Sequence, residues 1–229
     1  MSNELLDKLG FGKVFWPISP WHNFYMFPKE IDYDYNKKGL VDLFNLEVSF
    51  NPEANKNKIL DESLMNFIKK SNKLIMISLG TYVSGDVKFM KKLMKMCSHS
   101  KHHFIVAKGM NHSEYELPLN MWGKEYIPQR QILPYVDLVI SHGGNNTFTE
   151  VFYYGKPQVI IVCTPLDQFD NALRLSEFEL GVYIKRDELT TDNLLENKQV
   201  NHKLSEISQR MQKENKLAKA AEMIEKLAK

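Results

Sequence analysis

The stretch that decides the fold is DLVISHGGNNTFTEVFYYGKPQVIIVCTPLDQ, residues 137–168. It begins with an apolar run at 138–140, turns at the glycine pair 143–144 and enters a helix that we predict to start near Asn146. An apolar run that ends in glycines and a helix start is typical of a strand passing into the helix that covers it. The stretch therefore predicts a strand, a tight turn and a helix in succession.

The end of that helix is marked by Gly155 and Pro157. Glycine readily adopts the left-handed conformation at a helix C-terminus, and proline cannot continue the hydrogen-bond ladder. A run of β-branched residues at 159–162 then predicts a second strand. This strand–helix–strand unit builds parallel sheets covered by helices. Ligands bind such sheets outside the carboxyl ends of the strands, where the glycine turn is expected to lie.

The same alternation precedes this stretch. We predict a helix at 62–70, a buried strand at 74–79, a helix capped by Asp86 and a strand at 104–107. Apolar residues recur at spacings of three and four after Asp86, which favours a core stripe over a cofactor site: Met90, Leu93, Met94 and Cys97. The pattern predicts a doubly wound α/β domain from about residue 61 onward.

Breakers divide the remaining segments. The stretch 110–131 contains two prolines and a glycine and is predicted to be a loop, followed by a short helix at 131–136. After Gln168 a helix is expected to run to Gly181 as its C-cap, before a last strand at 182–184.

The C-terminal tail is predicted to be helical. Thr190 or Thr191 is expected to cap a short helix, and 203–229 to form a longer one. Its apolar residues share one face, namely Leu217, Ala221, Ile224 and Leu227 or Ala228. A basic amphipathic helix can lie on a membrane, but acidic residues dilute the charge here. Docking against the domain is the simpler interpretation.

Residues 1–60 differ from the rest and are interpreted as an aromatic- and Pro-rich N-terminal segment and linker, ahead of a domain at 61–229. A strand is expected at 24–27, and the polar stretch 51–61 is expected to be the linker. The aromatic residues either form a partner-binding surface or pack against the domain, and packing is the commoner role.

Composition indicates a folded protein with a sizeable core. The chain has 229 residues, 43% of them apolar, and its 30 Lys and Arg against 28 Asp and Glu give a formal charge of +2. Such a balance argues against a nucleic-acid partner. Cys97 and Cys163 are isolated and flanked by apolar residues, which fits buried thiols in a reducing compartment. The sequence has no recognisable secretory signal and no transmembrane segment, so we expect this chain to be soluble or cytoplasmic.

Three histidines at 98–103, His99, His102 and His103, suggest a metal site as one alternative. No acidic residue lies among them and the segment is polar, so a solvated turn is favoured. We expect no metal.

The glycine turn has the features of an anion site. A glycine pair lets the backbone approach a ligand, and the first helical turn offers unpaired amides at its positive end. Asn146 and Thr147 add side-chain donors, and Glu150 lies one helical turn further on, where a carboxylate could accept from a ribose diol. The alternative is a simple tight turn with Asn146 capping the helix, and these residues alone do not decide between the two.

Several other motifs are missing from the sequence. It contains no GxGxxG followed by a distant acid, no GxxxxGK[ST] and no GxSxG. A dinucleotide fingerprint, a triphosphate loop and a hydrolase elbow are therefore unsupported. The features of the glycine turn indicate an α/β domain that binds a phosphorylated nucleoside.

Longer stretches resemble a known family. YIPQRQILPYVDLVISHGGNNTFTEVFYYGKP at 126–157, followed by DQFDN at 167–171, resembles the signature of the UDP-glycosyltransferases. ISLGTYVSG at 77–85 resembles that family's first phosphate loop. NFYMFPKEIDYDY at 23–35 resembles the stretch before the C-terminal domain of arthropod members. The resemblance covers most of residues 24–185, in the order that the family has.

This resemblance implies a GT-B fold, in which two Rossmann-like domains face each other across a cleft. The chain would be the single C-terminal half, which binds the UDP-sugar donor without a metal or other cofactor. The family's catalytic base lies in the other domain, so no catalytic residue is expected here. The implied donor-binding residues are Thr81, Tyr126, Gln129, His142, Gly144, Asn146, Thr147, Glu150, Asp167 and Gln168.

The resemblance also implies a role for each of these residues. Tyr126 takes the place of a tryptophan that stacks on uracil in many members, and Gln129 contacts the uridine. His142, Gly144, Asn146 and Thr147 bind the diphosphate with Thr81, Glu150 binds the ribose, and Asp167 and Gln168 hold sugar hydroxyls. His142 is then expected to stabilise charge on the leaving UDP.

Two departures from the family pattern bear on function. The stretch between Gly155 and Asp167 is one residue longer than usual, and residues 1–60 do not resemble an acceptor domain with a catalytic dyad. The C-terminal membrane helix that anchors full-length animal relatives in the endoplasmic reticulum is also missing.

Three hypotheses follow. The chain is a donor-binding domain of a UDP-glycosyltransferase that transfers a hexosyl group to a small lipophilic acceptor and is inactive alone, or a half-enzyme that needs an acceptor-binding subunit, or a non-catalytic binding protein derived from the fold. Self-association is also expected, because an isolated half exposes a surface that the other domain would cover.

Overall fold

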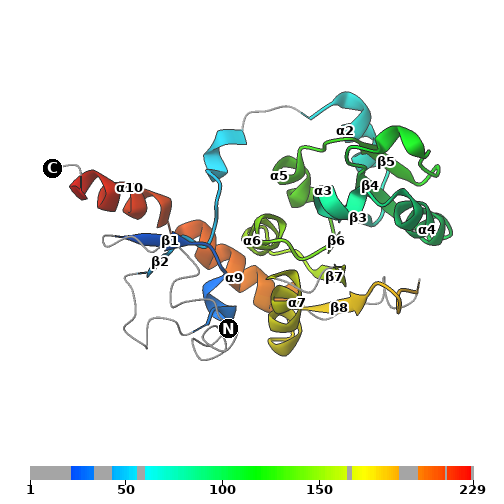
Figure 1. Cartoon of the computed structure of the whole chain (residues 1–229). Coiled ribbons are helices and arrows are strands. Elements are labelled where there is room, and N and C mark those ends of the chain that lie inside the picture. The colour runs from blue at the N-terminus through cyan, green and yellow to red at the C-terminus, as the bar shows by residue number, and fades with distance from the viewer. Residues whose placement is uncertain are drawn as a thin grey trace.

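A computed structural model describes residues 22–33, 43–55, 60–163, 167–190, 201–214 and 216–227. Its centre is a parallel sheet of six strands (Figure 1). The strands are β3 (Leu74–Ser78), β4 (His103–Ala107), β5 (Met121–Lys124), β6 (Leu138–Ser141), β7 (Gln158–Val162) and β8 (Gly181–Lys185). The helices are α2 (Glu62–Lys69), α3 (Gly80–Ser84), α4 (Val87–Ser98), α5 (Gln129–Ile132), α6 (Asn145–Tyr153), α7 (Asp167–Glu177), α9 (Asn201–Lys213) and α10 (Lys216–Leu227). Four 3-10 turns are also described: η1 (Lys29–Ile31), η3 (Pro52–Asn55), η4 (His112–Glu114) and η5 (Leu133–Tyr135).

The strand order is β5-β4-β3-β6-β7-β8. The first strand of the sheet, β3, is therefore central. The chain builds outward through β4 and β5 to one edge, then returns to the other side of β3 with β6. This reversal makes a topological switch point between β3 and β6, which is the doubly wound arrangement of a Rossmann-like domain. The predicted α/β fold is confirmed.

Helices cover both faces of the sheet. Ile75 and Ile77 of β3 pack in the cluster that contains the buried side of α4, while Leu74 and Met76 pack in the cluster that contains α2. All five residues of β3 are buried for this reason.

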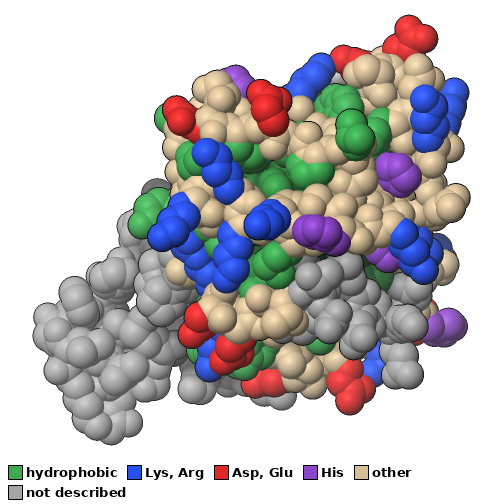
Figure 2. All heavy atoms as spheres, turned by 90° about the vertical axis from the view of Figure 1, so that its right-hand side faces the viewer, with side chains coloured by type: hydrophobic (Ala, Val, Ile, Leu, Met, Phe, Trp, Pro, Cys, Tyr) green, Lys and Arg blue, Asp and Glu red, His purple; other side chains and the backbone are tan. Residues whose placement is uncertain are grey.

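The helix α4 is amphipathic, as its spacing predicted. Asp86 caps it by accepting a hydrogen bond from the amide of Phe89, and its apolar stripe is buried. The lysines of the opposite side, Lys88, Lys91, Lys92 and Lys95, are exposed. Lys and Arg side chains gather on the face shown in Figure 2, the side of the molecule on which α4 lies in Figure 1.

The N-terminal segment packs against the domain. Its short strands β1 (Asn23–Tyr25) and β2 (Leu43–Asn45) pair in parallel. Ile31, Val48 and Phe50 are buried in one cluster with Phe148 and Phe152 of α6. This confirms packing as a role of these apolar residues.

A buried carboxylate fixes this segment to the last two helices. Glu47 has a positive φ of 61°, and only 2% of the residue is exposed. The Arg210 guanidinium of α9 donates to both Glu47 carboxylate oxygens, at 2.8 and 2.6 Å, and also to Glu30. Lys216 Nζ of α10 lies 2.5 Å from Glu47 Oε2. We call these four residues the Glu47 cluster.

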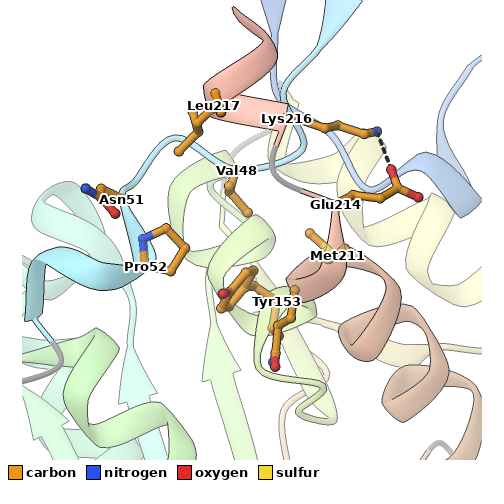
Figure 3. A pocket seen from close by; sticks show the side chains of 10 residues that line it. Val48, Asn51, Pro52, Tyr153, Met211, Glu214, Lys216 and Leu217 are labelled. Carbon is orange, nitrogen blue, oxygen red and sulfur yellow. Dashed lines mark hydrogen bonds and ion pairs between the residues drawn. The ribbon is translucent and has the colours of Figure 1, made fainter. Parts of the chain in front are cut away.

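A cavity of about 520 Å³ lies next to this cluster (Figure 3). Val48, Tyr153, Met211 and Leu217 contribute apolar side chains to its wall, and Lys216 is paired with Glu214 at its rim. The N-terminal segment, α6, α9 and α10 therefore meet around one space.

Some local predictions were wrong. β5 lies inside the stretch predicted to be a loop, because pairing with β4 outweighs its glycine. Gly181 is not a helix C-cap but opens β8, and the positive φ after α7 belongs to Glu179, at 55°. The helix expected after Thr190 or Thr191 falls on residues outside the described part of the chain.

The tail forms two helices in place of one. α9 docks as expected, with Leu204, Ile207 and Met211 buried. α10 extends away from the sheet, and Ile224 and Leu227 on its expected apolar face are 54% and 49% exposed, so the docking prediction is wrong for its outer turns (Figure 1). No described helix combines the length and the apolar character needed to span a bilayer.

The Glu47 cluster should contribute strongly to stability. Burial raises the pKa of Glu47, but hydrogen bonds from Arg210 and Lys216 outweigh this and lower it below its usual value. We expect Arg210→Met to lower the free energy of unfolding by about 2 to 4 kcal/mol at neutral pH, because it removes the main partner of a buried charge. The measurement is urea denaturation.

The pH dependence and a matched variant test the cause. Since the folded-state pKa of Glu47 is depressed, its stabilisation is present above about pH 4.5 and is lost as the pH falls through the folded-state value. The deficit of Arg210→Met should shrink there. Arg186→Met breaks the more exposed pair with Asp86 and should cost no more than about 1 kcal/mol. Equal losses in the two variants would contradict this account.

Candidate functional site

The switch point brings two loops together. Ser78 at the end of β3 pairs in register with Ser141 at the end of β6. Because the two strands are parallel, the segments that follow them lie at the same edge of the sheet. These segments contain Gly80 after β3 and the 142–144 turn after β6. Ligands of open α/β sheets bind at this position.

The His142 imidazole fills the space between these loops. A Cβ on Gly80 would lie 2.7 Å from both Cε1 and Nε2 of His142, and a Cβ on Gly144 would lie 2.5 Å from Nε2. No side chain larger than hydrogen fits at either position without moving the ring. Gly143 has a φ of 83°, which also favours glycine.

The first turn of α6 begins at a glycine. Gly144 is the N-cap residue, and it has no side chain that could accept from the first amides. The side chain of Asn146 is instead near Ser49, whose Oγ lies 3.4 Å from Asn146 Oδ1. The alternative in which Asn146 caps the helix is therefore wrong. Amides at a helix N-terminus carry the positive end of the helix dipole and suit an anion.

Asn171 of α7 holds the turn in place. This residue is 3% exposed, and its Nδ2 donates to the carbonyl of Gly143 at 2.7 Å and to Oδ1 of Asn145 at 2.8 Å. The backbone conformation that presents the α6 amides is thus supported from a second helix.

A carboxamide joins three elements at the same edge. Ser78 Oγ donates to Gln129 Oε1 at 2.7 Å. Gln129 Nε2 donates to Thr147 Oγ1 at 3.2 Å and to Glu150 Oε2 at 2.6 Å. Three residues expected from the sequence, Gln129, Thr147 and Glu150, therefore touch. Ser78 was not among the expected residues, and no local pattern distinguishes it from a core strand residue.

Glu150 is an acid in a buried setting. Its side chain is 13% exposed, and Arg130 Nε lies 3.8 Å from Oε1. Burial raises the pKa of Glu150, while the Gln129 hydrogen bond and the Arg130 charge act in the opposite direction. The sequence did not indicate Arg130 either.

A cavity of about 170 Å³ opens beside Gln129. The ends of β3, β4 and β5 form its walls, and two more expected residues, Thr81 and Tyr126, line it. Tyr126 is 69% exposed, so one face of its ring is accessible. The space suits a flat heterocycle next to the Gln129 carboxamide.

The remaining expected residues are at the start of α7. The carbonyl oxygen of Gln168 would lie 3.0 Å from a Cβ on Gly143, so this helix also reaches the turn. Gln168 Oε1 is buried and has no hydrogen-bond partner within the described residues. Asp167 opens α7, but its side chain is outside the described part of the structure.

The histidines at 98–103 make contacts with different parts of the structure. His99 Nδ1 contacts the carbonyl of Lys95 at 2.9 Å, and His103 opens β4 with its ring edge-on to Phe67. Among the described side chains, no three His, Cys, Asp or Glu residues are grouped to hold a metal ion.

The strand order, the crowded glycine turn and the uncapped helix start define a Rossmann-like domain with a ligand site at its switch point. Residues 62–227 match the family described as glycosyltransferase family 28 C-terminal domain. The match covers well over half of the chain. The chain belongs to this family and corresponds to the C-terminal half of a UDP-glycosyltransferase.

Curated relatives agree with this assignment. NDP-glycosyltransferase YjiC of Bacillus subtilis is 34% identical over 160 residues, which are 67% of this chain and 41% of that protein. UDP-glucuronosyltransferase 3A1 of Xenopus laevis is 31% identical over 147 residues, 60% of this chain and 28% of that protein. The chain thus spans less than half the length of either relative.

Solved structures share the fold. The glycotransferase of kitacinnamycin superposes with a TM-score of 0.73 at 18% identity, over 98% of this chain and 60% of that one. UDP-glucose: anthocyanidin 3-O-glucosyltransferase in complex with UDP gives 0.70 at 18% identity, over 90% of this chain and 52% of that one. The expected GT-B half is confirmed at the level of the fold.

Replacing Gly144 tests the crowding around His142. Gly144 has a φ of −65°, which alanine adopts freely, so only the contact with the imidazole opposes Gly144→Ala. We expect the variant to lose about 1 to 3 kcal/mol of stability and to shift the His142 ring signals in NMR spectra. Gly85→Ala is the control, because its Cβ would meet no atom closer than 3.2 Å. Unchanged His142 signals in Gly144→Ala would contradict the geometry.

Proposed function

We propose that this chain binds a UDP-sugar, the donor of a glycosyl transfer, at the carboxyl edge of its sheet. The observation that carries the proposal is the contact of Gln129 with both Thr147 and Glu150, at the start of α6 and beside the 170 Å³ cavity. A base-sized space, an acid and a helix start lie near one another here, and these would take the base, ribose and phosphates of a nucleoside diphosphate.

The nucleoside would occupy the cavity side of this arrangement. Uracil would stack on the accessible ring of Tyr126 and lie near the Gln129 carboxamide. The ribose diol would donate to the Glu150 carboxylate, which a fixed hydrogen bond from Gln129 already orients. A planar carboxylate can accept from two neighbouring hydroxyls at once.

The diphosphate would lie at the N-terminus of α6. The groups proposed to hold it are the amides after Gly144, the side chains of Asn146 and Thr147, and Thr81 of α3, the helix that follows β3. His142 stands between the two loops and would stabilise the charge that develops on UDP as it leaves. This is a role in binding the leaving group and not in abstracting the acceptor proton.

The sugar would extend toward α7. The buried and unpaired Gln168 Oε1 supports this direction, because a sugar hydroxyl would supply the hydrogen bond that the atom lacks among the described residues. Asp167 is proposed as its partner. The stretch between Gly155 and Asp167 is one residue longer than in the family pattern, so it bears most on where Asp167 and Gln168 meet the sugar.

The acceptor and the catalytic base are proposed to come from another domain or subunit. The chain spans 41% of YjiC and 28% of the Xenopus glucuronosyltransferase, and those names support transfer of a glycosyl group from a nucleotide donor. The family resemblance adds the proposal that a hexosyl group passes to a small lipophilic acceptor. We propose that helix amides and protein donors replace a metal in this reaction. The chain alone would then bind donor without transferring it.

Binding of UDP measured by isothermal titration calorimetry tests the donor site. We expect the wild-type chain to bind UDP and Glu150→Gln to bind at least about tenfold more weakly, because a charge-assisted hydrogen bond is lost. Glu222→Gln on the exposed side of α10 is the matched control and should bind as the wild type does. If the wild type shows no heat of UDP binding, the proposal fails.

A transfer assay tests whether the chain is inactive without an acceptor-binding domain or subunit. The chain incubated alone with UDP-glucose and a small phenol should form no glycoside, because no acceptor site or base is proposed in it. Product detected by mass spectrometry above the level of a protein-free blank would refute the proposed inactivity.

A further inference from the structure

Arg130 lies against Glu150, the largely buried acid of the proposed donor site. It follows Gln129 directly in α5, and its Nε lies 3.8 Å from Glu150 Oε1, while Gln129 Nε2 donates to Oε2. Each carboxylate oxygen thus faces a different partner. The side chain of Arg130 is one-third exposed.

An aromatic ring of the N-terminal segment holds the guanidinium. The Arg130 Cζ lies 5.2 Å from the centroid of the Phe50 ring. A planar guanidinium stacks on an aromatic face more favourably than an ammonium group does. Phe50 is itself buried between α6 and the segment that carries it. Arg130 is therefore supported on one side by Phe50 and directed on the other toward Glu150.

Few charged or titratable groups act on Glu150. Within the described residues, those that interact with it are Arg130 from α5 and Tyr154 from α6. Burial raises the pKa of Tyr154, so this phenol is neutral near pH 7 and offers no positive charge. Burial likewise raises the pKa of Glu150, and the Arg130 charge is one of two influences that lower it.

We propose that Arg130 is a positioning residue, which keeps Glu150 charged and oriented so that the site selects ribonucleotide over 2′-deoxyribonucleotide donors. The inference rests on the proposed function of Glu150. A charged carboxylate accepts hydrogen bonds from both ribose hydroxyls, whereas a neutral carboxyl group must also place a proton of its own. A 2′-deoxyribose supplies only one of the two hydroxyls. Selectivity for ribose therefore depends on the charge that Arg130 maintains.

The test compares the affinities of UDP and dUDP by calorimetry. In the wild type we expect dUDP to bind at least about tenfold more weakly than UDP, the value of one charge-assisted hydrogen bond. In Arg130→Gln this ratio should fall to about threefold or less at a pH between the titration midpoints of the wild type and the variant. Arg130→Lys keeps the charge and should restore most of the ratio.

The pH profile of the ratio separates a charge effect from a structural one. Both ligands carry the same diphosphate, so titration of phosphate and of groups around it cancels in the ratio. The preference for UDP should be present above the pKa of Glu150 and disappear as the pH falls through it. Because Arg130→Gln removes a cation, its midpoint should lie at higher pH than that of the wild type. Glu150→Gln should give a low ratio without a midpoint.

The outcomes distinguish this inference from the function on which it rests. If the wild type does not bind UDP, the proposed function itself fails. If it binds UDP and prefers it over dUDP, but Arg130→Gln keeps both the ratio and the midpoint, only the role of Arg130 is overturned. Circular dichroism checks that each variant is folded. Phe50→Leu is the second variant, which should lower the ratio by releasing the guanidinium, and an unchanged ratio would overturn the inference in the same way.

Discussion

The site depends on the close fit of the His142 imidazole between Gly80 and Gly144. The register of β3 and β6 brings Gly80 and the 142–144 turn to one edge of the sheet, and the ring then occupies space that a side chain at either glycine would need. This crowding fixes where α6 begins, because Gly144 is its N-cap. It therefore fixes the direction of the first amides of α6 and, one turn later, the position of Glu150. Asn171 and Gln129 add hydrogen bonds that hold the same geometry from neighbouring helices.

Two glutamates, the buried Glu47 and the largely buried Glu150, differ in how well their surroundings satisfy them. Glu47 accepts hydrogen bonds from Arg210, Lys216 and a backbone amide, and these lower its pKa despite burial. All of its accepting capacity serves the fold. Glu150 is largely buried, but it has one strong hydrogen bond and one more distant cation, and burial keeps its pKa raised. An acid that the protein only partly satisfies can gain hydrogen bonds from a ligand. The contrast supports the assignment of Glu150 to ribose.

Local sequence patterns predicted the parts of the structure that local forces determine. Apolar runs located β3, β6 and β7, Asp86 marked the start of α4, and Gly155 adopts the positive φ, 62°, expected after α6. Patterns failed where pairing or packing overrides local preference: β5 forms despite Gly123, and Glu179 takes the left-handed conformation that we expected at Gly181. The family signature indicated Gln129, Thr147 and Glu150, which the fold brings into contact. Ser78 contacts a residue 51 positions away, Arg130 one 20 positions away and Arg210 one 163 positions away. A short stretch of sequence therefore does not reveal these contacts. Such contacts become visible only once the sheet order is known.

The central claim is that the start of α6 and the adjoining cavity form one donor site. A crystal structure of the chain with UDP tests it most directly. The account predicts the diphosphate at the amides after Gly144, the ribose hydroxyls on Glu150 and the uracil against Tyr126. UDP bound at any other place on the chain, or with its ribose away from Glu150, would contradict it.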